Sequence, residues 1–523
     1  MENSDTPASH EGIASLKTVA KGAGIFLVGM VLSKFITYFT RIFIARYFGP
    51  EVYGLFSLGL AVIVFAGIFG VLGLPTGVTR YISYYRSKNE EAHVKGVLIF
   101  SLFTVALVSC ISGGILFLAS PRIAITVFHN PELTNVFRVF AISIPFTALF
   151  SILGSSFNGF REIKYRVYTE KIILNVLKLV LILFLGMLGY GVLGLAFAYT
   201  LATILTFFIA FYFLETRVFS LRTKTQPRYI NKELIIFSFP LMASGFMKTM
   251  MTRIDTIMLG HFRSVGEVGI YNAAIPTAQI LAIVTSSVGV LFLPVITELY
   301  AKGQKRPLEV VYKTVTKWTF YLNLPVLLIM VFFPRQIMNL IFGPDYVEGS
   351  LALSIIAVGF FMSTISFAPS CLITMAKKTR MIFVISIAAA LTNVVLNLSL
   401  IPIYGIAGAA MATTATYLVS STLLFGYTWR IMRMSPFSTG MIKSIPAGFL
   451  SLGIVYLGGR LIFQSFDWYM LIFLFALFLG LYAVLVLLLC GLQREDIEIL
   501  KAIERKTGIR NESIRNIIKR FIK

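Results

Sequence analysis

The sequence predicts an all-α polytopic membrane protein with about 14 transmembrane helices. Its composition excludes an ordinary soluble domain, since 57% of the 523 residues are hydrophobic, only 13% are charged and the mean hydropathy is +0.85. Long apolar runs recur along the whole chain at lengths that fit membrane helices. Two parts of the chain also resemble each other, which indicates an internal repeat.

Windows of about 20 apolar residues place the expected spans. They lie at residues 23–46, 54–84, 95–119, 136–158, 166–188, 192–215, 233–261, 270–299, 314–333, 350–376, 381–401, 405–429, 441–463 and 468–491. Basic residues gather in every second connection, starting with the one after the second span, and are sparse in the others. Because Lys and Arg near helix ends mark the cytoplasmic side, we expect both termini in the cytoplasm and therefore an even number of crossings.

Other protein classes lack support in the sequence. The net charge of +23 is spread over short connections and forms no single basic patch, so nucleic acid is not an expected partner. Cys110, Cys371 and Cys490 lie inside apolar runs, and the four histidines are scattered. We therefore expect no catalytic residues, no metal site and no cofactor, and the chain is not interpreted as an enzyme.

Three matches within the chain define the repeat. Lys34 corresponds to Lys248 at a shift of 214 residues, the GVLGLP motif at 70–75 to GVLFLP at 289–294 at a shift of 219, and Tyr190 to Tyr404 again at 214. Each copy contains six spans, so both copies have the same orientation. The repeat therefore predicts two six-helix halves related by a parallel pseudo-two-fold axis along the membrane normal.

The expected domain organisation follows from the repeat and the basic connections. It comprises a cytoplasmic N-terminal segment (1–22), an N-terminal six-helix half (23–216), a cytoplasmic linker (217–232), a C-terminal six-helix half (233–430), two additional transmembrane helices (431–491) and a basic cytoplasmic tail (492–523). Apolar residues recur at helical spacing in the tail, which we expect to rest on the anionic inner leaflet.

Seven charged side chains inside the spans indicate a cavity, because charges at membrane depth are costly and normally face a bundle interior or water. Six are cations and one is an acid: Lys34, Arg41, Arg80, Lys178, Lys248, Arg253 and Asp255. Lys34, Tyr38 and Arg41 share one helix face, since seven residues make about two turns. Arg80 has an alternative interpretation, as a side chain that reaches out to the cytoplasmic surface.

Asp255 and two prolines have further interpretations. Asp255 is a candidate site for proton or sodium coupling, and alternatively a counter-charge for Lys248 or for the first span; neighbouring cations favour the counter-charge. Pro75 and Pro294 occupy equivalent places in the repeat and are the expected hinge pair, because proline inside a membrane helix frees a carbonyl and bends the chain.

Several motifs resemble one known family. They are RIFIARYFGPEVYGLFSLGLAV, GLPTGVTRYISYY, GSSFNGFREIKYRVYTEKIILNVLKLVLIL and IYGIAGAAMATTATYLV. In this order they are similar to the polysaccharide transport branch of the multidrug/oligosaccharidyl-lipid/polysaccharide exporter superfamily. The resemblance implies a flippase in a prokaryotic cell membrane, which moves a prenyl-diphosphate-linked oligosaccharide or polysaccharide repeat unit from the inner to the outer leaflet by alternating access.

The positive charge of the expected cavity agrees with this substrate, because Lys and Arg can pair with a diphosphate inside a low-dielectric medium. The expected substrate-binding residues are Lys34, Tyr38, Arg41, Arg80, Asn175, Lys178, Lys248 and Arg253. The expected partners are the lipid-linked glycan, membrane lipids and other polysaccharide-assembly proteins, around a monomeric chain.

Two alternatives stay open at this stage. A multidrug or organic-cation exporter of the same superfamily should favour acidic or aromatic residues in its cavity. A membrane glycosyltransferase or polysaccharide polymerase would need a constellation of catalytic carboxylates or a large outer loop, and the outer connections here are short.

Overall fold

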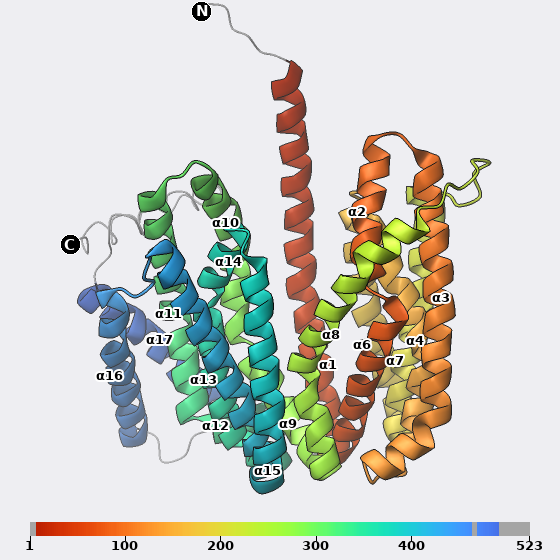
Figure 1. The fold of residues 1–523 in the computed structure, drawn as a ribbon. Helices are drawn as coiled ribbons and strands as arrows, with labels where there is room; N and C mark the ends of the chain where they lie inside the picture. The colour runs from red at the N-terminus through yellow and green to blue at the C-terminus, as the bar shows by residue number, and fades with distance from the viewer. Residues whose placement is uncertain (1–6, 463–467, 491–523) are drawn as a thin grey trace, which may run out of the picture. The chain divides into compact units, whose positions relative to one another are not determined.

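The protein is all-helical in the part that the structure describes (Figure 1). This computed structural model describes residues 7–462 and 468–490, so the expected basic tail lies outside the described residues. The chain forms two compact units, Met1–Ala273 and Ala274–Lys523, which are treated separately below. The predicted fold class is confirmed, while the number of crossings stays a prediction.

The first unit holds the helices up to the start of α9. They are α1 (Pro7–Val71), α2 (Leu74–Ser87), α3 (Glu91–Arg122), η1 (Ile123–Val127), α4 (Leu133–Gly159), α5 (Ile163–Arg166), η2 (Val167–Ile173), α6 (Leu174–Met187), α7 (Gly191–Phe213), η3 (Leu214–Val218), α8 (Asn231–Phe262) and α9 (Val265–Ala278). The elements η1, η2 and η3 are π-helical.

The second unit continues from α9 to the last described helix. Its helices are α10 (Leu281–Ala301), α11 (Lys305–Phe332), α12 (Pro334–Phe342), η4 (Pro344–Gly349), α13 (Ser350–Ile365), α14 (Phe367–Met375), α15 (Thr379–Met432), α16 (Thr439–Ile462) and α17 (Trp468–Cys490). Residues 431–491, expected to add two helices beyond the repeat, contain α16 and α17, which pack against each other.

Two long helices cover more than one predicted span: α1 contains the first span and part of the second, and α15 contains the spans at 381–401 and 405–429. α1 is interrupted at Gly49, where φ is 79° just before Pro50, and α15 is interrupted at Gly405, where φ is 53°. Glycine adopts this left-handed backbone without the steric cost that a Cβ brings. Ten stretches of the described chain are long and apolar enough to cross a membrane, and the stretches in α1 and α15 contain these interruptions.

The predicted second span, residues 54–84, is not one helix. α1 ends at Val71 and α2 begins at Leu74, and Leu72 and Gly73 between them both have positive φ. A Cβ on Gly73 would lie 2.3 Å from the carbonyl oxygen of Ser238 in α8. Position 73 therefore has room only for a glycine beside α8, and Pro75 lies in the first turn of the restarted helix.

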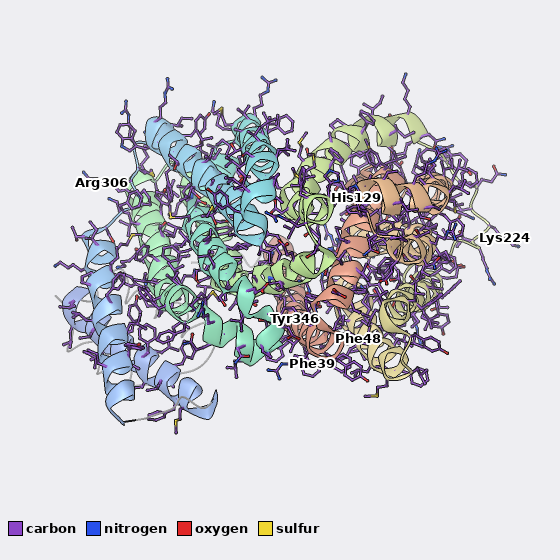
Figure 2. The ribbon with its side chains drawn as sticks, turned by 90° about the horizontal axis from the view of Figure 1, so that it is seen from below. Phe39, Phe48, His129, Lys224, Arg306 and Tyr346 are labelled. Atoms are coloured by element: carbon purple, nitrogen blue, oxygen red, sulfur yellow. The ribbon has the colours of Figure 1, made fainter. Side chains whose placement is uncertain are left out.

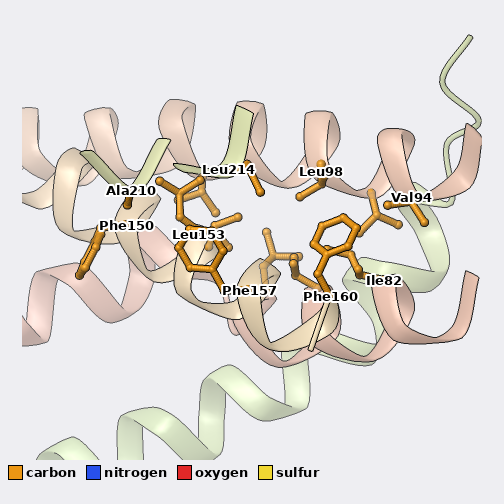
Figure 3. Packing of buried hydrophobic residues seen from close by; sticks show 14 of the residues in the cluster. Ile82, Val94, Leu98, Phe150, Leu153, Phe157, Phe160, Ala210 and Leu214 are labelled. Atoms are coloured by element: carbon orange, nitrogen blue, oxygen red, sulfur yellow. The ribbon is translucent and has the colours of Figure 1, made fainter. Parts of the chain in front are cut away.

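An apolar cluster fixes α2, α3, α4 and α7 to one another in the first unit (Figure 3). Phe157 of α4 is fully buried and lies near Leu153 of the same helix, while Phe160 lies near Ile82 of α2. Close packing of this kind holds membrane helices together where lipid removes the usual hydrophobic driving force. Leu74, Val78 and Ile82 all belong to this cluster, so it supports α2 from its first residue onward.

The predicted linker, residues 217–232, is docked on the first unit. The Lys95 ammonium donates to the backbone oxygen of Thr223 at 2.6 Å, and the Arg228 amide donates to the oxygen of Ala92 at 2.9 Å. Lys224 is exposed at the rim of the unit (Figure 2). The compact units divide beyond this linker, at Ala273, so that α8 packs with α1 and α2. The two six-helix halves stay a prediction from the sequence repeat.

Candidate functional site

A cavity of about 440 Å³ lies within the first unit. It is bounded by the second arm of α1, the beginning of α2, the middle of α4, one residue of α7 and the middle of α8. Its polar lining consists of Thr76, Ser143, Thr147, Ser151, Tyr199, Lys248 and Thr249. The cavity thus joins hydroxyl groups, which suit hydrogen bonding to a polar ligand, with a single lining cation.

The start of α2 adds to the positive character of this cavity. Gly73, Pro75 and Thr76 line it, so the first turn of α2 borders the same space as Lys248. The N-terminus of a helix carries partial positive charge on its unsatisfied N–H groups. A helix that is interrupted at membrane depth and ends at a cavity is a common way to place such charge near a substrate.

Tyr199 connects the cavity with a group of three cations, Arg41 of α1, Lys178 of α6 and Arg253 of α8. The Lys178 ammonium lies 4.0 Å from the centroid of the Tyr199 ring, which is a cation–π contact. Arg253 lies within electrostatic range of Arg41 and of the hydroxyl of Tyr199. Four helices therefore bring their polar side chains to one place.

Arg41 and Arg253 repel each other at this place. Both are only partly exposed, so water screens their repulsion less than it would at an open surface. Tyr53, which is buried, lies near both and donates its hydroxyl to the backbone oxygen of Asn272 at 3.1 Å. An anion bound between the guanidinium groups would offset the repulsion, and a planar guanidinium can hold two oxygens of a phosphate at once.

Asp255 is nearly inaccessible, with 4% of its surface exposed. Its Oδ2 accepts a hydrogen bond of 3.0 Å from the Tyr271 hydroxyl of α9, and the next residue, Thr256, bonds Asn272. Asp255 therefore belongs to a polar seam between α8 and α9. Both interpretations of Asp255, ion coupling and counter-charge, stay predictions.

The other predicted residues are distributed more widely. Asn175 donates to the Ser33 hydroxyl at 3.0 Å and accepts from the Thr37 hydroxyl at 3.2 Å, so its amide joins α6 to α1. Lys34 is exposed and Tyr38 is half-buried on α1. Arg80 lies beyond the cavity toward the end of α2, over the ring of Phe237.

The hinge candidates differ in what the structure describes. Pro75 lines the cavity at the restart of α2, as stated above. Pro294 falls within α10, and its side chain is outside the described part. The pairing of these two prolines as hinges stays a prediction.

Glu170 was missed in the sequence analysis, which counted only one acid inside the spans. Its carboxylate contacts Arg166 at 2.7 Å and Lys171 at 2.6 Å, on the π-helical segment η2. The fifth predicted span thus contains one acid that is paired with two cations, a group with one positive charge left over. The spacing of Arg166 and Glu170, four residues apart, was the available signal.

A second hollow, of about 590 Å³, lies along α16 in the second unit. It is lined by apolar residues, glycine and proline between Ile445 and Leu457. Without a polar group it offers no means of recognising a charged or sugar-bearing molecule.

This fold and this cavity define a class, the multi-pass all-helical membrane transporters. Over 88% of this chain and 97% of the other, the structure superimposes on that of the lipid II flippase MurJ with a TM-score of 0.71 and 17% sequence identity. At this identity the likeness establishes the fold.

The chain belongs to the polysaccharide biosynthesis protein family, whose model matches residues 19–300, and so to the polysaccharide branch of the exporter superfamily named above. The MatE model also matches residues 240–399. The putative O-antigen transporter of Shigella flexneri is 23% identical over 75% of this chain and 92% of its own length. The capsular polysaccharide biosynthesis protein CapF of Staphylococcus aureus is 22% identical, over 77% and 97%.

Proposed function

We propose that this protein is a flippase, which moves a prenyl-diphosphate-linked oligosaccharide or polysaccharide repeat unit from the inner to the outer leaflet by alternating access. The convergence of Arg41, Lys178 and Arg253 beside a cavity that contains Lys248 is the observation that carries the proposal. A diphosphate must leave water to cross the membrane, and paired cations offset part of that cost. The names of the related transporters support the same substrate class.

The parts of the site have separate roles in this proposal. Arg41 and Arg253 bind the diphosphate, and Lys178 stays near it through its contact with Tyr199. The hydroxyl groups of the cavity bind sugar hydroxyls. The prenyl chain stays in the lipid beside the helices, so the site needs no apolar tunnel of its own.

The chain is a multi-pass membrane protein, and we infer that it lies in the cell membrane of a prokaryote with both termini in the cytoplasm. The basic connections support this orientation through the positive-inside rule. We further infer a monomer that works with other polysaccharide-assembly proteins.

The alternative with a specific observation in its favour is a multidrug exporter, because the MatE model matches residues 240–399. An exporter of organic cations needs acidic or aromatic side chains at its site. The three converging cations argue against that substrate. For the glycosyltransferase or polymerase alternative, the names of the O-antigen transporter and of the lipid II flippase favour transport instead.

The test is flipping of a short-chain lipid-diphosphate oligosaccharide by purified protein in vesicles, with wild type beside Arg253→Gln. Loss of a charge-assisted contact should lower the flipping rate about tenfold to a hundredfold. Lys224→Gln, which removes an exposed linker cation, is the matched control and should keep the wild-type rate. Absence of flipping by the wild type, together with uptake of an organic cation, would move the protein to the multidrug branch.

A further inference from the structure

The last two turns of α2 carry an unusual concentration of rings and cations. Arg80, Tyr81, Tyr84, Tyr85 and Lys88 follow one another at spacings of one, three and four residues, so they share one face of the helix and its C-cap. The positive-inside rule places this end of α2 on the cytoplasmic side. Tyr81 and Tyr85 pack against the edge of the apolar cluster, and the cation group around Tyr199 includes none of the five residues.

The rings form a continuous stack across three helices. Tyr85 lies parallel to His93 of α3, with centroids 4.5 Å apart and planes at 10°, and Tyr81 lies 6.3 Å from Tyr85 on α2. Tyr84 meets Tyr85 edge-on at 5.1 Å, and Phe237 of α8 meets Tyr81 edge-on at 5.9 Å. We call these five rings the aromatic platform.

Tyr84 is the exposed ring of the platform, with 49% of its surface accessible, whereas the other four rings are partly buried. The Lys88 ammonium lies 4.5 Å from the centroid of this ring. The Tyr84 hydroxyl raises the pKa of Lys88 above its ordinary value, so Lys88 keeps its charge at neutral pH. Glu90 and Glu233 lie near Tyr85, and carboxylates of this kind accept hydrogen bonds from hydroxyl groups.

Arg80 adds an anion-binding group at the end of the platform closer to the cavity. Its guanidinium lies 4.3 Å from the centroid of Phe237 and 5.6 Å from that of Tyr81. A guanidinium that stacks on rings keeps its N–H groups free at the edge, where they can bind a phosphate. Arg80 is exposed, and within the described part of the chain it has no hydrogen bond or ion pair.

The platform is continuous with the cavity. Thr76, one helical turn from Arg80, and Leu241, one turn from Phe237, both line the cavity. Tyrosines at helix ends also serve as membrane-interface anchors, whose rings lie at the level of the lipid headgroups. Here the rings stack on one another between α2, α3 and α8 and lead from the cytoplasmic end into the cavity.

We propose that the aromatic platform is a loading site, at which the sugar next to the diphosphate stacks on Tyr84 and Tyr81 while Arg80 binds the diphosphate. The proposal rests on the proposed function and assigns it a first binding step. The flat face of a pyranose fits an exposed aromatic ring, and its hydroxyls find Lys88 and the nearby carboxylates as partners. Release from the platform would deliver the phosphate end of the molecule into the cavity first.

The experiment compares two soluble probes on the full-length protein in detergent: a short-prenyl diphosphate that carries a disaccharide, and the same prenyl diphosphate without sugar. Tyr84→Leu should weaken binding of the sugar-bearing probe about threefold to tenfold and leave the sugar-free probe unchanged. Tyr84→Phe, which keeps the ring, should bind both probes nearly as the wild type does. Arg80→Gln should weaken both probes. Tyr229→Leu, at another exposed tyrosine, is the matched control.

Flipping kinetics supply a second readout. Tyr84→Leu should raise the substrate concentration at half-maximal rate while the maximal rate stays the same, because the platform acts before translocation. Three outcomes would each overturn the loading site. In the first, Tyr84→Leu binds both probes equally weakly; in the second, Tyr229→Leu weakens binding of the sugar-bearing probe as much as Tyr84→Leu does. In the third, Tyr84→Leu binds the sugar-bearing probe with wild-type affinity. If Tyr84→Leu accumulates poorly, Tyr84→Gln serves the same comparison. A wild type that neither binds nor flips the sugar-bearing lipid refutes the proposed function itself. Flipping by Tyr84→Leu with the wild-type substrate concentration at half-maximal rate refutes only the platform.

Discussion

At the scale of single residues, the spacing of charged side chains along one helix predicted part of the candidate site. Lys34 and Arg41 share a face, as predicted, yet Arg41 is half-buried near Arg253 while Lys34 is exposed. Spacing determines the face of one helix but not which neighbouring helix covers each turn. Contacts between distant helices, such as that of Lys178 with Tyr199, therefore needed the structure.

Asp255→Asn tests the two interpretations of the buried acid. Asparagine keeps an oxygen that can accept the hydrogen bond from Tyr271, but it removes the charge. If Asp255 is a counter-charge, Asp255→Asn should lower the free energy of unfolding by about 1 to 3 kcal/mol. The response of transport to imposed proton or sodium gradients should then stay unchanged. Thermal melting and gradient-driven flipping measure the two effects. Loss of the gradient response in Asp255→Asn, with Glu132→Gln normal, would establish ion coupling instead.

Asn175 was predicted to bind substrate, and its contacts make a structural prediction possible. Its amide bonds Ser33 and Thr37 of α1, and such bonds between membrane helices contribute about 1 kcal/mol each. Asn175→Leu should therefore lower the melting temperature of the purified protein and leave the flipping rate per folded molecule unchanged. If Asn175→Leu is as stable as the wild type but no longer flips the substrate, Asn175 is a substrate-binding residue, as the sequence predicted.

At the scale of elements, apolar runs predicted most helices because length and hydropathy are local properties. Hydropathy does not show the interruption at Leu72 and Gly73, and the approach of Ser238 from α8 to Gly73 is a contact between distant parts of the chain. The motif GVLGLP contained its signal, a glycine followed two residues later by proline, and was interpreted only as a repeat and a hinge. The docking of the linker through Lys95 likewise depends on a distant contact.

Gly73→Ala probes this interruption. The left-handed backbone costs alanine about 1–2 kcal/mol, and the added Cβ would also force α8 away from the start of α2. We expect a lower melting temperature and slower flipping. Gly67→Ala is the matched control, because Gly67 lines the same cavity and a Cβ there meets nothing within 4 Å. Equal behaviour of the two variants would show that the interruption tolerates a side chain.

At the scale of the whole molecule, the family and the helical class agree with the sequence analysis, and the orientation is open to a direct test. In a chain whose cysteines are replaced by alanine, we expect Lys224→Cys to be shielded from a membrane-impermeant maleimide added outside intact cells. Glu132→Cys, in a sparsely charged connection, should react. The reverse labelling pattern would place both termini outside.

The docked linker has a practical consequence for the variation that this region can tolerate. Thr223 accepts from Lys95 through its backbone oxygen, and Arg228 donates to Ala92 through its backbone amide. Because both contacts involve backbone atoms of the linker, they do not depend on its side chains. Residues between Thr223 and Arg228 should therefore tolerate substitution as long as the path of the backbone is kept. A short epitope or fluorophore attachment point at Lys224 should therefore report on the protein without loosening its attachment.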